Sequence, residues 1–137
     1  MSSRSLTVLH PAFRSKAEQF LEAAYQAGLD VLVYCTMRTF DEQTMLYAQG
    51  RTVPGKIVTN AKAGQSAHNY GLAFDGAPLI GGKIAWDDHP HWLLYGQVAK
   101  QIGLEWAGTW VSFKEYPHIQ LPNWEQLKPK DNPNVNP

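Results

Sequence analysis

Residues 64–75 of the chain read GQSAHNYGLAFD, a stretch that joins a glycine-containing loop to the start of a strand. His68 leaves the loop, and Asp75 follows it on the strand. Apolar and polar positions alternate here, with Leu72 and Phe74 on the face opposite Asp75. The pattern predicts a half-buried strand that delivers the Asp75 carboxylate at its end. An imidazole nitrogen and a carboxylate oxygen together suit Zn²⁺, although this spacing alone also fits a satisfied core histidine.

A catalytic zinc site needs a third protein ligand and an open position, and the segment from Glu115 to His118 is the candidate source of that ligand. In a regular strand these two residues would face opposite sides. Pro117 cannot donate to a strand ladder and favours a strand's first position, so we expect the chain to bend just before His118. Such a bend would bring Glu115 over the metal as a general base and acid. The alternative is that Glu115 is a solvated surface charge.

Helix and strand signals alternate along the rest of the chain. A proline or capping residue at the start and a glycine at the end predict helices over 11–28, 39–50 and 90–103. Strands are predicted at 30–36, 71–75, 79–80 and 83–84 and within 105–121, and a long functional loop at 51–66. We therefore predict an α+β fold, a small antiparallel sheet with about three helices. One domain over 1–121 would precede an irregular tail over 122–137.

Composition limits the function classes. The chain has 137 residues, enough for one domain with a stable core. Twelve basic and twelve acidic side chains cancel, so we expect no nucleic-acid partner and no charge-driven membrane binding. No segment approaches the roughly 18 apolar residues of a membrane span, and we expect no membrane insertion. The N-terminal residues lack the apolar core of a signal peptide, which predicts synthesis in a cytoplasm and another route of export.

Several reactive residues have structural interpretations. Cys35 is the only cysteine and lies in an apolar run, so it is interpreted as a buried core residue, with a catalytic thiol as the alternative. His10 precedes a predicted helix and is assigned a structural role. The triplet from His89 to His91 could be a metal-binding motif, but its central proline favours a helix start capped by a preceding aspartate.

Two blocks of the sequence resemble a known family. The first is EQTMLYAQGRTVPGKIVTNAKAGQSAHNYGLAFD at 42–75, and the second is FKEYPHIQL at 113–121, after the tryptophans of 105–110. They resemble the L-alanyl-D-glutamate peptidases of the zinc D-Ala-D-Ala carboxypeptidase/endopeptidase family, which include many phage endolysins. The resemblance covers roughly residues 34–121. It rests on a Ser-x-His-x-x-Gly-x-Ala-x-Asp block, an upstream arginine and a downstream acid-x-x-His.

The resemblance implies a role for each matching residue. The Zn²⁺ ligands would be His68, Asp75 and His118, and Glu115 would be the general base. Arg38 would bind a substrate carboxylate or stabilise the oxyanion, for which a permanently charged planar fork is suited. Ser66 would orient the substrate or the loop, with a simple turn residue as the alternative.

The sequence also departs from the family pattern. Endopeptidases of the family often carry Asp where this chain has Glu115, whereas dipeptidases and carboxypeptidases carry Glu. The extra methylene affects the reach of the base more than its chemistry. Three aromatic residues near the second block are candidates for the cleft wall, with core packing as the alternative: Trp106, Trp110 and Tyr116.

The resemblance implies a zinc-dependent peptidoglycan endopeptidase that cuts the L-alanyl-D-glutamate bond of the stem peptide. We expect a monomeric endolysin, made in the host bacterial cytoplasm and released through a holin to act on the periplasmic cell wall in host lysis. One alternative is a D-alanyl-D-alanine carboxypeptidase acting on the same peptides. A less favoured alternative is a non-catalytic cell-wall-binding module, against which the complete set of ligands and base argues.

Overall fold

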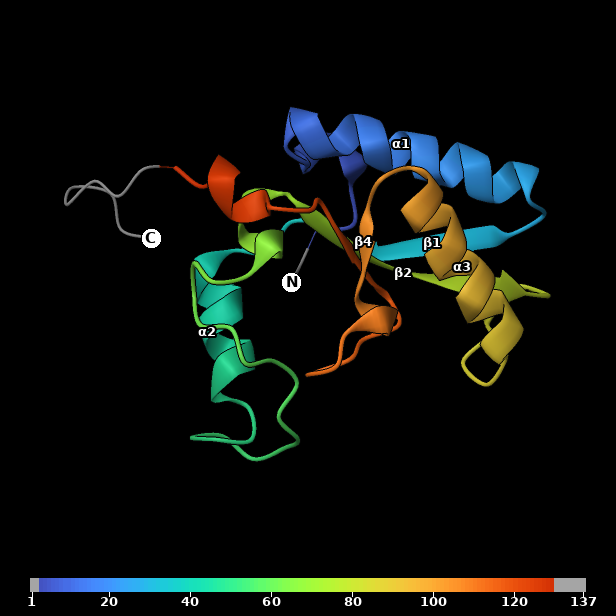
Figure 1. Ribbon diagram of the computed structural model, residues 1–137. Helices are drawn as coiled ribbons and strands as arrows, with labels where there is room; N and C mark the ends of the chain where they lie inside the picture. The colour runs from blue at the N-terminus through green and yellow to red at the C-terminus, as the bar shows by residue number, and fades with distance from the viewer. Residues whose placement is uncertain (1–2, 130–137) are drawn as a thin grey trace.

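The computed structural model describes residues 3–129 and contains a five-stranded antiparallel sheet of order β1-β2-β5-β4, with β3 paired to β2 (Figure 1). The strands are β1 (Asp30–Cys35), β2 (Ala73–Ile80), β3 (Lys83–Ile84), β4 (Glu105–Trp106) and β5 (His118–Gln120). The α-helices are α1 (Pro11–Gln26), α2 (Phe40–Ala48) and α3 (His89–Gln101). Short 3₁₀ turns are η1 (Leu6–Val8), η2 (Ala67–Tyr70), η3 (Ala107–Thr109) and η4 (Trp124–Leu127). These elements confirm the predicted α+β fold.

Helices α1 and α3 build the core against the sheet. Helix α1 buries Phe13 and Phe20, which follow the helical spacing seen in the sequence. The Phe20 ring lies 5.5 Å from that of Phe74 on β2 and 5.3 Å from that of Tyr95 on α3, so one aromatic cluster joins both helices to the sheet. Each fully buried Phe contributes about 1.5–3 kcal/mol to stability. No helix in residues 3–129 has the length and apolar content that a membrane span requires.

The helix starts follow the predicted capping chemistry. The Nδ1 atom of His10 accepts a hydrogen bond from the first turn of α1, which confirms a structural role for this histidine. Thr39 and Glu42 form a reciprocal capping box at α2. The Asp88 side chain caps α3 by accepting from the backbone N–H of His91, so the His89–His91 triplet starts a helix.

Strand β2 differs from the prediction because both of its faces are buried. Phe74 packs under α1, while Ala73 and Ala77 on the opposite face are also fully buried. The reason is that η2 packs against β2 and carries His68 onto the Asp75 face. The prediction of a half-buried strand is therefore wrong, although Asp75 does lie on the face opposite Phe74.

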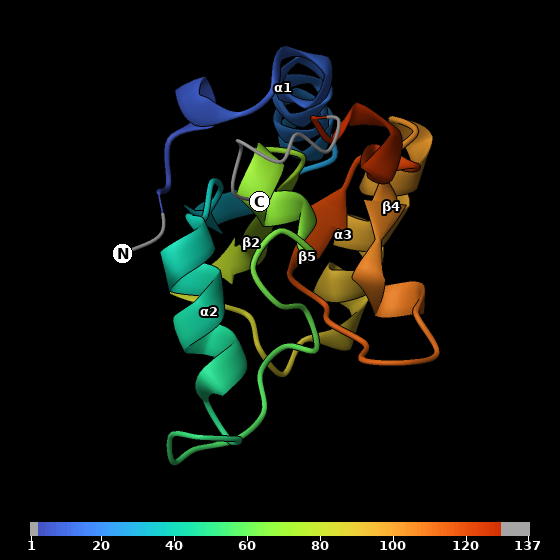
Figure 2. The same ribbon diagram turned by 90° about the vertical axis from the view of Figure 1, so that its left-hand side faces the viewer.

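The two views place α1 on one side of the sheet and α2 with the segments 51–66 and 107–117 on the other (Figures 1 and 2). After β5 the chain continues along the domain: Trp124 of η4 is buried and its ring stacks 5.8 Å from that of Tyr70. Residues 122–129 of the predicted tail thus pack on the fold in part. Residues 130–137 lie outside the described residues.

Candidate active site

The turn η2 presents His68 to the sheet, and its two ends explain the residues around it. Ser66 caps the turn, because its Oγ accepts a hydrogen bond from the backbone N–H of His68 at 3.2 Å. Gly71 ends the turn at φ +70°, and a Cβ there would lie 2.8 Å from the backbone nitrogen of His10, so glycine is needed. Ser66 therefore has the structural role of a cap on η2, and it also lines the cavity described below.

His68 is buried, and its two ring nitrogens have different surroundings. Nδ1 lies 2.8 Å from the carbonyl oxygen of Thr36. Because a carbonyl only accepts, Nδ1 carries the proton and donates it. Nε2 is then directed at Asp75, 3.2 Å from Oδ1. The strand before the turn thus fixes the ring and leaves one nitrogen available for a ligand.

His118 has the same arrangement from the other side of Asp75. It lies opposite Asp75 in the β2–β5 register, with Nδ1 3.3 Å from the same Oδ1 atom. Its other nitrogen, Nε2, is 2.7 Å from Oε1 of Gln120, which accepts the hydrogen bond. Sequence reasoning missed Gln120. The available signal was its position, two residues after His118 and therefore on the same face of the strand.

Charge and burial shift the pKa values of this centre in the absence of metal. Burial alone would raise the pKa of Asp75, but His68 and His118 outweigh it and hold that pKa far below its usual range. Burial alone would lower the pKa of His68, but the Asp75 carboxylate outweighs it and raises that pKa to about 10. Without a metal, the centre is an ion pair of carboxylate and imidazolium.

Glu115 lies over this centre, as the sequence predicted. Ligand atoms of Glu115, Asp75 and His118 lie within 4.8 Å of one another. Strand β5 begins directly after Pro117, whose carbonyl oxygen accepts hydrogen bonds from the backbone N–H of Gly76 on β2 at 3.1 Å and from the hydroxyl of Tyr95 on α3 at 2.7 Å. The expected bend before His118 is present. Burial and the Asp75 charge raise the pKa of Glu115.

Arg38 reaches the centre from the end of β1. Its Nη1 donates a hydrogen bond to Gln43 Oε1 at 2.9 Å, and its Nη2 lies 3.8 Å from Asp75 Oδ2. Gln43 is fully buried and also donates to the carbonyl oxygen of Ala61 at 2.7 Å. Because Gln43 is itself fixed, it holds the guanidinium of Arg38 in place. Among the described residues, nothing accepts a hydrogen bond from the Nε of Arg38. Sequence reasoning did not single out Gln43.

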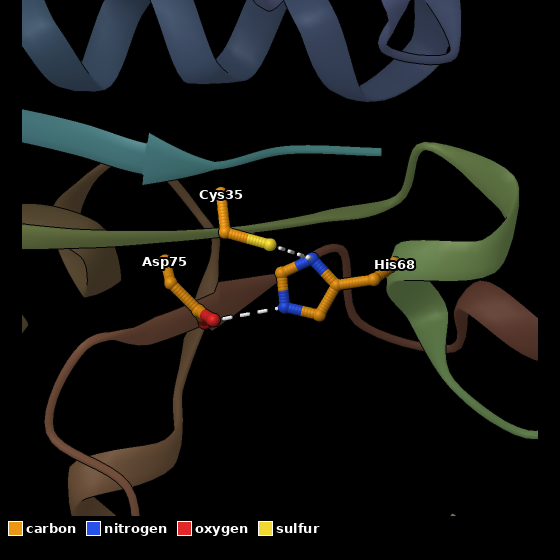
Figure 3. Close-up of side chains that lie close together, drawn as sticks. All are labelled: Cys35, His68 and Asp75. Atoms are coloured by element: carbon orange, nitrogen blue, oxygen red, sulfur yellow. Dashed lines mark hydrogen bonds and ion pairs between the residues drawn. The ribbon is translucent and has the colours of Figure 1, made fainter. Parts of the chain in front are cut away.

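Cys35 is buried, as predicted, yet it lies at the edge of this centre rather than in the apolar core. Its Sγ is 3.8 Å from Nδ1 of His68, and Figure 3 shows Cys35 and Asp75 at opposite nitrogens of that ring. Burial disfavours the thiolate, but His68 and Arg38 lower the pKa of Cys35 overall. Because the nearer nitrogen already donates to Thr36, Cys35 does not share a ligand position with Asp75.

A cavity of about 1080 Å³ opens onto these side chains. The predicted loop 51–66 forms part of its wall with Ile57 and Val58, which supports a functional role for this segment. Of the three aromatic candidates, Trp110 and Tyr116 line the cavity. Trp106 does not, because it is buried in the core. The expected core alternative therefore holds for that residue.

Comparison with known proteins identifies the family. A family profile described as D-alanyl-D-alanine carboxypeptidase matches residues 59–121. The peptidoglycan L-alanyl-D-glutamate endopeptidase CwlK of Bacillus subtilis is 43% identical over 122 residues, which cover 82% of this chain and 73% of CwlK. This chain belongs to the D-alanyl-D-alanine carboxypeptidase family. The L-alanyl-D-glutamate peptidase of Listeria phage A118 is 27% identical over 79% of this chain, which spans only 36% of that enzyme.

Solved structures of the family share the fold. The Serratia marcescens L-Ala D-Glu endopeptidase ChiX superposes with a TM-score of 0.63 at 20% identity, covering 92% of each chain. The D,D-pentapeptidase VanY with bound Zn(II) gives a TM-score of 0.64 at 15% identity, covering 85% of this chain and 74% of VanY. The family consists of zinc enzymes, and this family member is a zinc metallopeptidase.

The side chains of this family member fit a zinc ion. Two imidazole nitrogens and a carboxylate oxygen converge, which is a donor set that Zn²⁺ accepts. Each imidazole donates its other nitrogen's proton to a fixed oxygen, as ligand histidines in zinc proteins do. The carboxylate of Glu115 lies beside this set and offers a base for hydrolysis.

Proposed function

We propose that this protein is a zinc endopeptidase that hydrolyses the L-alanyl-D-glutamate bond of peptidoglycan stem peptides. The observation that carries the proposal is the meeting of Glu115 with Asp75 and His118 in one cavity, on a chain 43% identical to an enzyme with that activity. The ligands are Nε2 of His68, the carboxylate of Asp75 and Nδ1 of His118. A bound Zn²⁺ supplies a Lewis acid that polarises a carbonyl and lowers the pKa of water.

The chain's own residues perform the proton transfers. The carboxylate of Glu115 removes a proton from the attacking water and then returns it to the leaving amine of D-Glu. Its raised pKa suits this double role, because it makes the carboxylate a stronger base toward water and brings its pKa closer to the working pH, where one group can both take up and return a proton. One group therefore serves as base and acid in turn.

Arg38 meets the negative charge of the substrate. Arg38 lines the cavity, its guanidinium lies 3.8 Å from Asp75 Oδ2, and its buried Nε has no acceptor among the described residues, so the side chain retains donor capacity beside the metal ligands. The D-Glu residue next to the bond carries a carboxylate, and the oxyanion that develops during attack is a second acceptor. Ser66 lines the same cavity beside His68 and supports the loop that faces the substrate.

The experiment is to incubate the zinc-loaded protein with Gram-negative peptidoglycan and identify the fragments by mass spectrometry. Stem peptides that begin with D-Glu, with L-Ala left on the glycan, would support the proposal. Free D-Ala alone would instead establish a D-alanyl-D-alanine carboxypeptidase, a second candidate favoured by the family profile and by the glutamate at position 115. Binding without any cleavage would favour a wall-binding module.

We further propose that the protein acts as a lysis enzyme, reaching the wall from the host cytoplasm through a holin. The similarity to the Listeria phage A118 peptidase supports this role. Added to Gram-negative cells with a permeabilised outer membrane, the protein should lower the optical density of the culture. The matched Glu115→Gln protein should not. Equal turbidity loss with both proteins would contradict an enzymatic lysis role.

A further inference from the structure

Trp86 is a large apolar side chain that the hydrolytic mechanism does not use. It lies in the turn between β3 and α3, is 58% exposed, and lines the same cavity as Glu115 and His118. Binding sites favour tryptophan because it offers a wide, rigid contact surface. An exposed indole on the wall of an active-site cavity therefore indicates a contact with part of the substrate.

The indole of Trp86 is held as the outer member of a ladder of rings. Its ring centroid lies 5.7 Å from that of Trp92, with the planes 24° apart. Trp92 is followed by Tyr116 at 5.9 Å, and Tyr116 by Trp106 at 5.8 Å. The indole nitrogens of the two buried tryptophans donate to backbone carbonyls at 2.9 and 2.6 Å, so the inner rings are fixed. The inner rings therefore support the indole of Trp86, which forms a platform that can offer its outer surface to a ligand.

The ladder also connects the platform to the catalytic segment. Tyr116, its third member, directly follows Glu115 in the chain. The exposed ring of His89 lies edge-on to Tyr116, 6.1 Å away, and adds a hydrogen-bonding group beside the rings. A flat apolar face next to polar groups suits a pyranose, which has an apolar C–H face and a rim of hydroxyl groups.

The chemistry of the substrate determines what such a platform meets. In peptidoglycan the L-Ala nitrogen is joined through a lactyl group to N-acetylmuramic acid, so a sugar ring follows on the amino side of the scissile bond. Neither L-Ala nor D-Glu has a ring that could stack on an indole. We propose that Trp86 forms a saccharide subsite that binds the N-acetylmuramoyl residue of the glycan strand. This subsite rests on the proposed function, and it makes glycan-linked stems better substrates than free peptides.

The kinetic test compares one stem peptide in two forms, free and linked to N-acetylmuramic acid. Trp86→Ala should lower kcat/KM for the linked form by about 3- to 10-fold more than for the free peptide, the range that one aromatic stacking contact supplies. Trp86→Tyr should retain most of the preference. Tyr25→Ala, which removes an exposed ring from α1 outside the cavity, should change neither substrate. Equal losses on both substrates would overturn the subsite.

A binding measurement separates the subsite from the proposed function. A peptide-free tetrasaccharide of N-acetylglucosamine and N-acetylmuramic acid should shift the NMR signal of the Trp86 indole N–H, assigned with Trp86→Ala. A shift in a protein that cuts no L-alanyl-D-glutamate bond would reject the function and keep the saccharide site. Cleavage with no shift and no preference for linked stems would keep the function and reject the subsite. Melting temperatures of the variants show whether any loss reflects unfolding.

Discussion

Gln120 holds the outer nitrogen of His118 at 2.7 Å, and this contact decides which nitrogen faces Asp75. Replacing Gln120 by Leu removes the acceptor and frees the ring to turn. We expect Gln120→Leu to weaken zinc affinity by about 10- to 100-fold, the usual effect of losing such a partner. Gln120→Glu keeps an acceptor oxygen and should retain tight binding. Competition titration with a chromophoric chelator measures both, and equal affinity of the Leu variant would contradict the orienting role.

Glu115 is the residue whose loss should separate chemistry from metal binding. Glu115→Gln keeps the shape but removes the base, so we expect one zinc per chain and a fall in kcat of about 10²- to 10⁴-fold. Glu125→Gln is the matched control, because Glu125 is an exposed carboxylate on the same cavity and should keep full activity. Metal analysis and turnover of a stem peptide give the two readouts. A fully active Glu115→Gln would reject Glu115 as the base.

At the scale of single residues, the sequence indicated the centre but not its supports. The spacing of His68 and Asp75 was a weak signal by itself, and the family resemblance of this block and of the acid-x-x-His pair implied the roles of His68, Asp75, Glu115 and His118. The role of Gln120 depends on a side-chain rotamer, which sequence periodicity does not determine. Cys35 shows the same limit: an apolar run predicted its burial, but the contact with His68 arises from how β1 and η2 meet.

Among the elements, the contact of α3 with the β4 segment depends on two glycines around one ring. A Cβ built at Gly96 of α3 or at Gly108 would overlap the indole of Trp106. A glycine inside a helix normally costs about 1 kcal/mol relative to alanine, so alanine at position 96 would stabilise an isolated helix. In this fold the overlap outweighs that gain.

We therefore expect Gly96→Ala to destabilise the protein by about 1–3 kcal/mol, as overpacked cores do. Gln97→Ala, at the exposed neighbouring position, controls for helix propensity and should leave stability nearly unchanged. Urea denaturation followed by circular dichroism measures both. A stabilised Gly96→Ala protein would show that α3 and Trp106 can separate without cost.

Element boundaries were predictable where local chemistry marks them. Pro11, the Thr39 capping box and Asp88 begin the three helices, and each interaction lies within one turn of sequence. Burial of faces was less predictable. Val98 of α3 is buried, whereas Ile102, the apolar residue directly after the helix, is only half-buried. Which side of a helix faces the core depends on tertiary packing, and the same holds for the second face of β2.

On the scale of the whole molecule, the site depends on strand register. Asp75 lies opposite Cys35 on β1 and opposite His118 on β5, so one residue joins two strands that are distant in sequence. A shift of one residue would turn His118 to the other face of the sheet. The sequence contains no local signal for this register: the residues made the segment from Glu115 to His118 the candidate source of a third ligand, and the family resemblance implied that His118 is that ligand.

The ion pair of this metal-free centre makes stability depend on pH. His68 has a pKa of about 10 in the folded protein against 6.5 when unfolded, so its contribution is complete below pH 6.5 and is lost as the pH rises toward 10. The Asp75 pKa is lowered, so its contribution is present above the usual aspartate pKa and is lost only in acid. Together they predict greatest stabilisation between the ordinary pKa values of the two groups.

We therefore expect the free energy of unfolding of chelator-treated protein to fall between pH 6.5 and 9. The reason is that the unfolded chain releases the His68 proton in this range while the folded chain keeps it. Urea denaturation at several pH values measures the slope. His68→Gln should flatten it. Zinc-loaded protein should keep its stability through this range, because ligand binding needs the deprotonated imidazole. A stability that rises with pH in the chelator-treated protein would contradict the buried pair.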